Sequence, residues 1–499
     1  MPTSGQTKYP AIPGIPDISL ESPLTGFGEV LTSTPQPSSQ VAFVYALNPQ
    51  VVTSYVYGTA ASASVVNGEV VLASGTTTTG YARVFSKRVA KYRPGQATNV
   101  RWTARFTAGS SGNRQMAGPY NIEGGYQFGY NGTSFGILYT EAATVEVQTL
   151  TVTGAPAVGG NVTVTLDGGP GVLVAVTVSG NTSITASEIA AADYSQVAGG
   201  WTAQAVANVV YFTRRLPGTA GASTFNAGAT GTAATFAILT TGAAATETFI
   251  PQASWNKDPF NGSGPSGASI DTTKGNVFAV QFQYLGYGDA FFYIENPLTG
   301  RLTLVHVIQN ANARTSTNLR NPNLYLTWES RNTGTATSVT LRGASGGAFI
   351  EGPILMPLTQ FSAVSTATCG AGTETPILTI RASTVYANRL STVQVQVDRI
   401  SIACDGTKSV AFKVYKNSTL TAAKWVAVGA ASSASYDFSA TASTGGTLVY
   451  AFSAAKTANV TEALSDLVLS LQPGETLTLT GTSVNASDVT AAFVWIEDL

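Results

Sequence analysis

The sequence predicts a mainly β protein with two antiparallel β-sandwich domains, a small α+β domain inserted in the first of them, and an extended N-terminal arm. Three observations support this prediction. Short runs of β-branched and aromatic residues recur from residue 41 to the end, separated by turns rich in Gly, Asn and Pro. One hairpin can be placed residue by residue. The composition changes between residues 147 and 246, where a helix-like stretch lies among Thr/Val strands.

Composition and charge narrow the classes of partner. Among 499 residues, 44% are hydrophobic and only 11% charged, well below the ~25% of ordinary soluble domains. Such a surface suits burial against copies of the same chain or against other proteins, although extracellular domains share this composition. The net charge of -1 provides no field for nucleic acid or an acidic membrane. The chain shows neither a secretion signal nor a run of about 18 apolar residues, so we expect synthesis in a cytoplasm and no membrane insertion.

Residues 1–40 are predicted to form an extended arm. Proline fixes φ and removes a backbone donor, so this segment cannot lie inside a sheet. Its apolar residues favour an arm laid on another surface, and a disordered tail is the alternative. The prolines are Pro10, Pro13, Pro16, Pro23, Pro35 and Pro37, and the apolar residues are Ile12, Ile15, Ile18 and Leu20.

The first sandwich is predicted to begin at residue 41. In residues 99–106 the apolar side chains alternate with polar ones, as in an antiparallel sheet with one wet face. The predicted strands cover residues 41–45, 51–57, 69–73, 82–86 and 99–106. A basic cluster lies between them, which we interpret first as a solvated strand and loop, second as a contact to an acidic partner surface, and only third as a nucleic-acid site. Its members are Arg83, Lys87, Arg88, Lys91 and Arg93.

The hairpin at residues 125–139 organises this sandwich. Asn131-Gly132 favours a two-residue type I′ turn, which needs positive φ at both central positions. One face of the hairpin is then aromatic and β-branched, and it faces the core. The predicted pairs are Tyr130 with Thr133, Phe128 with Phe135 and Tyr126 with Ile137. Residues 248–256 are predicted to continue this sheet, with Tyr139 and Phe249 as neighbours.

Residues 147–246 are therefore predicted to be an inserted domain, and the sandwich comprises 41–146 and 247–359. The insertion has strands at 150–153, 162–166, 172–178, 200–203 and 209–213 and a helix at 183–192. Its residues 162–178, 184–192 and 200–203 resemble small domains of phage tail and baseplate proteins. After the insertion we predict strands at 277–284, 290–295, 301–308, 324–328, 338–341 and 348–350. The second sandwich, residues 360–499, has predicted strands at 377–380, 391–397, 409–415, 448–452, 476–480 and 492–496.

Several motifs of the first sandwich resemble virion proteins of large tailed phages and giant viruses. These motifs are residues 86–95, 129–137, 251–256, 274–276, 284–288 and 296–297. In such proteins the second motif leads into the third after a few residues, which supports the predicted insertion. The resemblance implies a virion structural component with jelly-roll-like domains, and it transfers no catalytic residue.

Chemistry-bearing residues are scarce. The single histidine, His306, alternates with Leu302, Leu304 and Ile308, so we predict a core or boundary side chain. Cys369 and Cys404 are predicted to be buried thiols, with a disulfide as the minority alternative. Ser266 lies in a glycine-rich loop without the strand-to-helix context of a nucleophile. We predict no catalytic, cofactor-binding or metal-ligating residue, and no enzyme.

Three functions compete. The first is a virion structural protein, as capsid decoration, tail, baseplate or fibre component, that docks by its arm and forms a homo-oligomer, with a trimer favoured. The second is an adhesin for host-surface glycans, with Tyr287 and Trp255 stacking on sugar rings, although our first interpretation of both side chains is packing within turns. The third is a virion-associated glycan hydrolase using a carboxylate pair among Asp271, Asp289 and Glu295.

Overall fold

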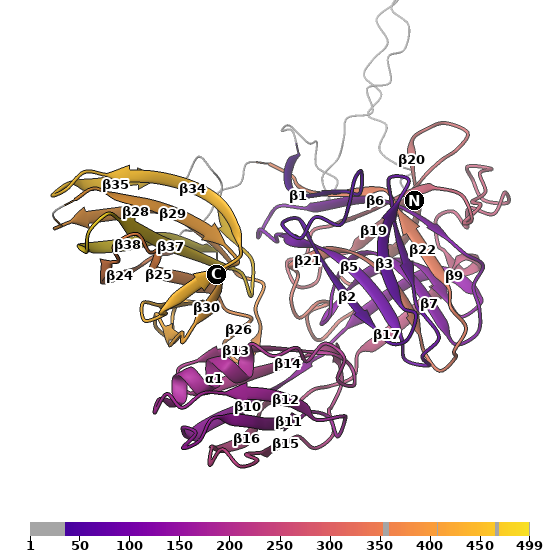
Figure 1. Cartoon of the computed structure of the whole chain (residues 1–499). Coiled ribbons are helices and arrows are strands. Elements are labelled where there is room, and N and C mark those ends of the chain that lie inside the picture. Colours follow the sequence, from indigo (N-terminus) through magenta and orange to yellow (C-terminus); the bar gives the residue numbers. More distant parts are fainter. Residues whose placement is uncertain (1–34, 353–358, 407, 465–468, 499) are drawn as a thin grey trace, which may run out of the picture.

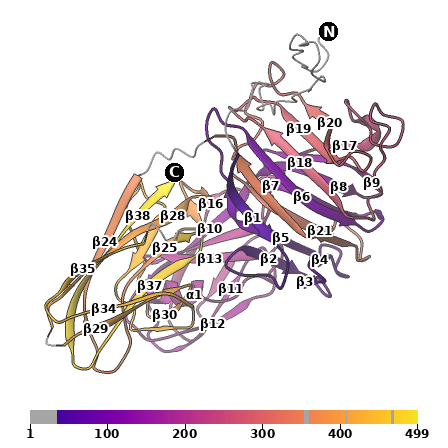
Figure 2. The same ribbon diagram turned by 90° about the horizontal axis from the view of Figure 1, so that it is seen from above.

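The computed structural model describes residues 35–352, 359–406, 408–464 and 469–498. Strands make up 56% and helices 3%, which confirms the mainly β fold class. The strands gather in three groups (Figure 1), and the first group lies to one side of the other two (Figure 2). Each group has a hydrophobic core of its own.

The first group consists of two antiparallel sheets packed face to face. The seven-stranded sheet has the order β17 (Thr246–Pro251), β9 (Ser134–Glu141), β8 (Gly124–Asn131), β7 (Asn113–Asn121), β21 (Leu324–Asn332), β5 (Tyr81–Ala90) and β2 (Val52–Tyr57). The nine-stranded sheet has the order β20 (Leu302–Ile308), β19 (Ala290–Glu295), β18 (Asn276–Phe282), β6 (Thr98–Phe106), β22 (Thr340–Gly343), β4 (Glu69–Ala73) and β3 (Ser62–Val66). Beside β6 lie β23 (Ser345–Ile350) and then β1 (Gln36–Ala42). A 3-10 turn, η1 (Gln252–Ser254), follows β17.

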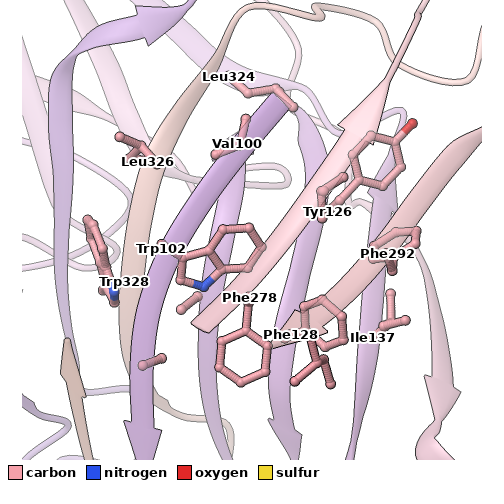
Figure 3. Close-up of a cluster of buried hydrophobic side chains, with 14 of the residues drawn as sticks. Val100, Trp102, Tyr126, Phe128, Ile137, Phe278, Phe292, Leu324, Leu326 and Trp328 are labelled. Atoms are coloured by element: carbon pink, nitrogen blue, oxygen red, sulfur yellow. The ribbon is translucent and has the colours of Figure 1, made fainter. Parts of the chain in front are cut away.

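Aromatic side chains from both sheets fill the core between them (Figure 3). The alternation of β6 holds, since Val100, Trp102, Ala104 and Phe106 are all buried. The ring of Phe128, from the other sheet, lies 4.9 Å from Phe278 and 6.2 Å from Trp102. Burial of such large rings is the main stabilising contribution that this sandwich shows.

The predicted hairpin register is wrong by two residues, although the predicted core face is correct. The observed pairs are Tyr130 with Phe135, Phe128 with Ile137 and Tyr126 with Tyr139. Only Gly132 of the turn has positive φ, at 63°, and the loop is Gly132-Thr133, a pattern of type II′ rather than type I′. A shift of two residues keeps every side chain on its face, because side chains alternate with period two.

Two predictions about the beginning of the chain are corrected. The arm was predicted to extend to residue 40, but β1 already begins at Gln36. Pro37 is tolerated because β1 pairs only with β23 and its register shifts between Pro37 and Ser39. The predicted strand at 41–45 ends at Ala42. Residues 1–34, the rest of the predicted arm, lie outside the described residues.

The second group is built on β10 (Val145–Gly154). Its four-stranded sheet has the order β13 (Trp201–Val206), β14 (Val209–Pro217), β10 and β16 (Ala233–Thr240), and its three-stranded sheet has β12 (Val172–Val176), β11 (Gly160–Thr165) and β15 (Thr224–Asn226). The helix α1 (Thr182–Ala190) begins after Asn181, whose side chain accepts the amides of Ser183 and Ile184. Thr248 pairs with Tyr139 and Phe249 with Leu138. The predicted continuation of the hairpin sheet across this group is therefore confirmed.

The third group has a five-stranded and a six-stranded sheet. The first contains β24 (Thr359–Cys369), β38 (Ser487–Asp498), β28 (Gln394–Cys404), β35 (Asn459–Ala463) and β36 (Ser470–Leu471). The second contains β31 (Val426–Ala427), β32 (Ala434–Asp437), β25 (Thr375–Ala382), β37 (Thr476–Ser483), β29 (Val410–Lys416) and β34 (Thr447–Ala454). Short ladders join β26 (Val385–Tyr386) to β27 (Arg389–Leu390) and β30 (Thr419–Thr421) to β33 (Ala442–Thr444).

Both cysteines are free and buried, as predicted. Burial raises the pKa of Cys369 to about 11, so its thiol stays protonated at neutral pH. Among the described residues, no helix has the length and apolar character needed to cross a membrane.

Candidate docking groove

A groove of about 1040 Å³ lies on the outer face of the nine-stranded sheet. Its floor includes Arg101 and Thr103 of β6 and Phe349 of β23, which point away from the core. Its wall is the segment of residues 43–51 between β1 and β2. Gly347 leaves space beside Phe349 on the floor, because a Cβ at this position would lie 3.1 Å from the Phe349 ring.

The wall segment holds two apolar side chains in solvent. Val44 is 62% exposed and Tyr45 is 93% exposed. Phe43, just before them, is buried, packs edge-on against Trp328 at 5.2 Å, and donates its amide to Ala344 O at 3.0 Å. At the other end, the amides of Val51 and Val52 donate to Asn48 O at 2.9 Å. The exposed pair is thus anchored on both sides, and we define Val44, Tyr45 and the groove floor as the docking groove.

The docking groove has little charge. Arg101 is the charged side chain among the residues that line it in the described chain, and its guanidinium lies 5.8 Å from the ring centre of Phe349. Exposed apolar surface next to a hollow is typical of a protein interaction site. The groove therefore suits an apolar polypeptide segment better than a charged partner.

The two aromatics proposed for sugar stacking are not equivalent. Trp255 is only 5% exposed and packs against Phe128 at a ring distance of 5.7 Å, so packing, our first interpretation, is confirmed and the stacking alternative is wrong. Trp255 directly follows η1, the 3-10 turn after β17, and belongs to the hydrophobic core of the first group. Tyr287 is 46% exposed in the turn after β18. The sequence motif around Trp255 is thus a packing motif.

Two of the three candidate carboxylates accept hydrogen bonds in local turns and loops, and the third lies at a strand end. Asp271 accepts the amide and hydroxyl of Thr273 and pairs with Lys274 at 3.3 Å. Asp289 accepts the amides of Asn310 at 2.7 Å and Ala311 at 3.2 Å. Glu295 ends β19 on the surface. In the part of the chain that the structure describes, no group of three or more His, Cys, Asp or Glu side chains could hold a metal ion.

His306 is a nearly buried side chain, as predicted. Its Nδ1 accepts the amide of Asn256 at 3.1 Å, and its ring lies 6.1 Å from Phe292. Burial, and to a lesser extent Lys257, lowers the pKa of His306 to about 4. The imidazole is therefore neutral at physiological pH. The backbone amide of Ser266 donates to the carboxylate of Asp258 at 2.9 Å, so Ser266 lies in a hydrogen-bonded loop.

The basic cluster is not a solvated strand, which corrects our first interpretation. Arg83 is buried in an ion pair with Glu329. Its other members contact the third group of the same chain: Lys87 pairs with Glu475, Arg88 donates to Ser470 at 3.2 Å, and Arg93 and Lys91 reach Asp498 at 2.8 and 3.4 Å through side-chain atoms. The acidic partner surface is thus supplied within the chain.

Two features were missed by sequence reasoning, namely the docking groove and the contact surface of the basic cluster. The run Val41 to Tyr45 offered a signal for the first, because a strand with period two cannot bury both Val44 and Tyr45. The second had no local signal, since Lys87 and Glu475 are 388 residues apart in sequence.

Comparison with known proteins identifies no family. No family model matches the chain, and no curated protein matches it. Among solved structures, the metal-free carbohydrate recognition domain of Emp46p matches at 8% identity and a TM-score of 0.23, over 64% of this chain and 97% of that one. Lectin II from Ulex europaeus matches at 9% identity and 0.23, over 64% and 100%. The STIV MCP matches at 11% identity and 0.15, over 79% and 96%. TM-scores of this size support no conclusion about fold or function.

Proposed function

We propose that this chain is a non-enzymatic structural protein of a virion, and that it oligomerises by laying residues 1–34 in the docking groove of a neighbouring copy. The observation that supports this most directly is the anchored, solvent-exposed pair Val44 and Tyr45 beside an almost uncharged hollow. The sequence resemblance to virion proteins supplies the setting.

The position of the chain's N-terminal segment supports this choice of occupant. The described chain starts just before β1, and β1 runs directly into the wall of the docking groove. The 34 residues before it carry Ile12, Ile15, Ile18 and Leu20, and they can span at most about 110 Å when extended. That reach is sufficient for a groove on an adjacent copy. Burial of these apolar side chains in a groove with little charge is favourable, because few charged groups would lose their water.

Removal of residues 1–34 tests the assembly step. We expect the full chain to sediment as an oligomer, with a trimer favoured, and the truncated chain to sediment as a monomer in analytical ultracentrifugation. Val44→Ser and Tyr45→Ser should weaken the full-length oligomer, because each replaces exposed apolar surface that the arm would cover. Leu298→Ser is the matched control, since Leu298 is also exposed but lies in the β19–β20 turn.

A full-length monomer at millimolar concentration, or equal effects of the control and groove variants, would contradict this assembly. If the segment instead docks on its own chain, the full-length protein stays monomeric and Tyr45→Ser changes only its protease resistance, which also contradicts the proposal. The virion role is tested separately by peptide mass spectrometry of purified particles. Absence of this chain from the particles would overturn that part.

A further inference from the structure

A second hollow, of about 170 Å³, lies where the three groups of strands meet. One side is the outer face of the seven-stranded sheet, with residues of β2, β5, β7 and β21. Opposite lie Thr213 to Arg215 of β14 and residues of the third group such as Gln472. We call this space the junction cavity; two of the strands that line it, β2 and β14, are labelled in Figure 1.

Aromatic rings form one wall of the junction cavity. Tyr55, Phe85 and Tyr325 lie in a row on adjacent strands, with 5.2 Å between the ring centres of each neighbouring pair. All three are partly exposed rather than buried, although they sit on a sheet whose other face is the core. Neighbouring rings are tilted by 70° and 60° to each other, so the row offers several separate ring contacts to a cyclic ligand rather than one flat surface.

The charged residues lining the cavity are all cations. Three of them form ion pairs: Arg83 with Glu329, Lys87 with Glu475, and Arg214 with Asp167. Arg215 is different: its guanidinium lies 4.0 Å from the ring centre of Tyr55, and among the described residues no carboxylate is within ion-pair distance of it. None of the residues that line the cavity in the described chain is Asp or Glu. Arg215 is therefore the lining cation whose charge is not matched by an ion pair among the described residues.

Polar atoms in the same walls lack partners. The hydroxyl of Thr213 and the Nε2 of Gln472 are buried without a hydrogen bond, on residues that are only 2% and 6% exposed. The Nε atoms of Arg214 and Arg215 are also buried and unpaired. Buried polar groups in folded proteins nearly always have partners, so a cluster of unsatisfied donors at one cavity indicates something that accepts from them.

We propose that the junction cavity binds a six-membered ring bearing a carboxylate and hydroxyl groups, the chemistry of an acidic monosaccharide. The ring would pack against Phe85 and Tyr325, the carboxylate would pair with Arg215 beside Tyr55, and hydroxyl oxygens would accept from Gln472 and Thr213. The volume of about 170 Å³ is enough for the ring itself, because a cavity of about 150 Å³ is known to hold one benzene ring, and the substituents would lie against the polar walls. This inference does not depend on the virion role or on the docking groove.

Titration calorimetry and saturation-transfer NMR on the full chain test this inference, with glucuronate as the probe. We expect saturable binding of glucuronate, at least tenfold weaker binding of glucose, which lacks the carboxylate, and at least tenfold weaker binding of inorganic phosphate, which lacks the ring. Arg215→Gln should reduce glucuronate affinity at least tenfold. Arg301→Gln, on an exposed turn, is the matched control and should bind as the native chain does.

A second variant keeps the test sharp if Arg215→Gln disturbs the junction. Tyr55→Leu retains an apolar side chain but removes the ring that lies against Arg215, and it should lower glucuronate affinity while leaving the thermal midpoint within a few degrees. The inference is overturned if glucuronate does not bind the native chain, if glucose or phosphate binds equally well, or if both variants bind glucuronate with native affinity. A cavity filled only with water gives the first of these results.

Discussion

Arg83 and Glu329 form a buried ion pair between the adjacent strands β5 and β21, with side chains 5% and 11% exposed. Burial alone would raise the pKa of Glu329, but Arg83 and then Arg331 outweigh it and hold the pKa below its ordinary value of 4.5. The folded pKa therefore lies below the unfolded pKa. Stability from this carboxylate is complete above about pH 4.5 and is lost as the pH falls through the folded pKa.

Glu329→Gln should cost about 3 to 5 kcal/mol in the free energy of unfolding at pH 7, because Arg83 keeps its charge in a buried site without its counter-charge. The difference between the native and variant chains should shrink as the pH falls from 5 to 3. Urea unfolding across this range measures it, and Glu295→Gln on the surface is the control. A difference that stays constant with pH would contradict the assigned ionisation.

At the scale of single residues, the sequence predicted burial better than partners. Alternation in residues 99–106 correctly placed Trp102 and Phe106 in the core, because a strand has only two faces. No such period covers Trp255, which ends a short 3-10 turn, so its burial could be expected only from packing within the turn. It also could not find Asp498 for Arg93, since 405 residues separate the two in sequence. The junction cavity could not be predicted either, because the residues that line it are far apart in the sequence.

At the scale of elements, the hairpin of β8 and β9 shows where local rules stop. Type I′ and type II′ turns both use two loop residues and both favour Gly, so Asn131-Gly132 does not by itself choose between them. Choosing type I′ moved every pair by two residues while leaving the core face unchanged. The pairing of β9 with β17 was predictable, because the apolar residues of both strands are buried when the two strands lie side by side in one sheet.

The turn type makes a prediction of its own. Gly132→Ala should cost about 1 to 2 kcal/mol, since its φ of 63° is unfavourable for a residue with a Cβ, although an added Cβ would meet nothing within 4 Å. Thr133→Ala should cost much less, because Thr133 has negative φ in a type II′ turn. Thermal unfolding of both variants measures this. Equal costs at the two positions would argue against the turn.

At the scale of the whole molecule, long-range polar contacts hold the third group of strands to the other two. Lys87 of the first group pairs with Glu475, which Lys416 of the third group also contacts at 2.8 Å, while Arg93 and Lys91 of the first group reach Asp498. On the other side, Arg381 stacks on Trp425 at 3.8 Å and donates to Ala205 O in the second group. Cations and carboxylates of a chain with only 11% charged residues thus meet at this junction.

Removing the cations of β5 and its following loop should loosen this arrangement. In the double variant Lys87→Met and Arg93→Met, Glu475 and Asp498 each lose a charged hydrogen-bond donor, at a cost of about 1.5 to 3 kcal/mol per site. Because the pairs join different groups of strands, we expect the radius of gyration from small-angle X-ray scattering to increase while the circular dichroism of the β-sheets stays unchanged. Arg399→Met, which removes the exposed pair with Asp398, is the control and should leave the scattering profile as it is. An unchanged radius of gyration in the double variant would contradict this role of the basic cluster. It would mean that apolar contacts and the hydrogen bond from Arg381 to Ala205 O are sufficient to hold the third group, and that the junction cavity keeps its shape without the basic cluster.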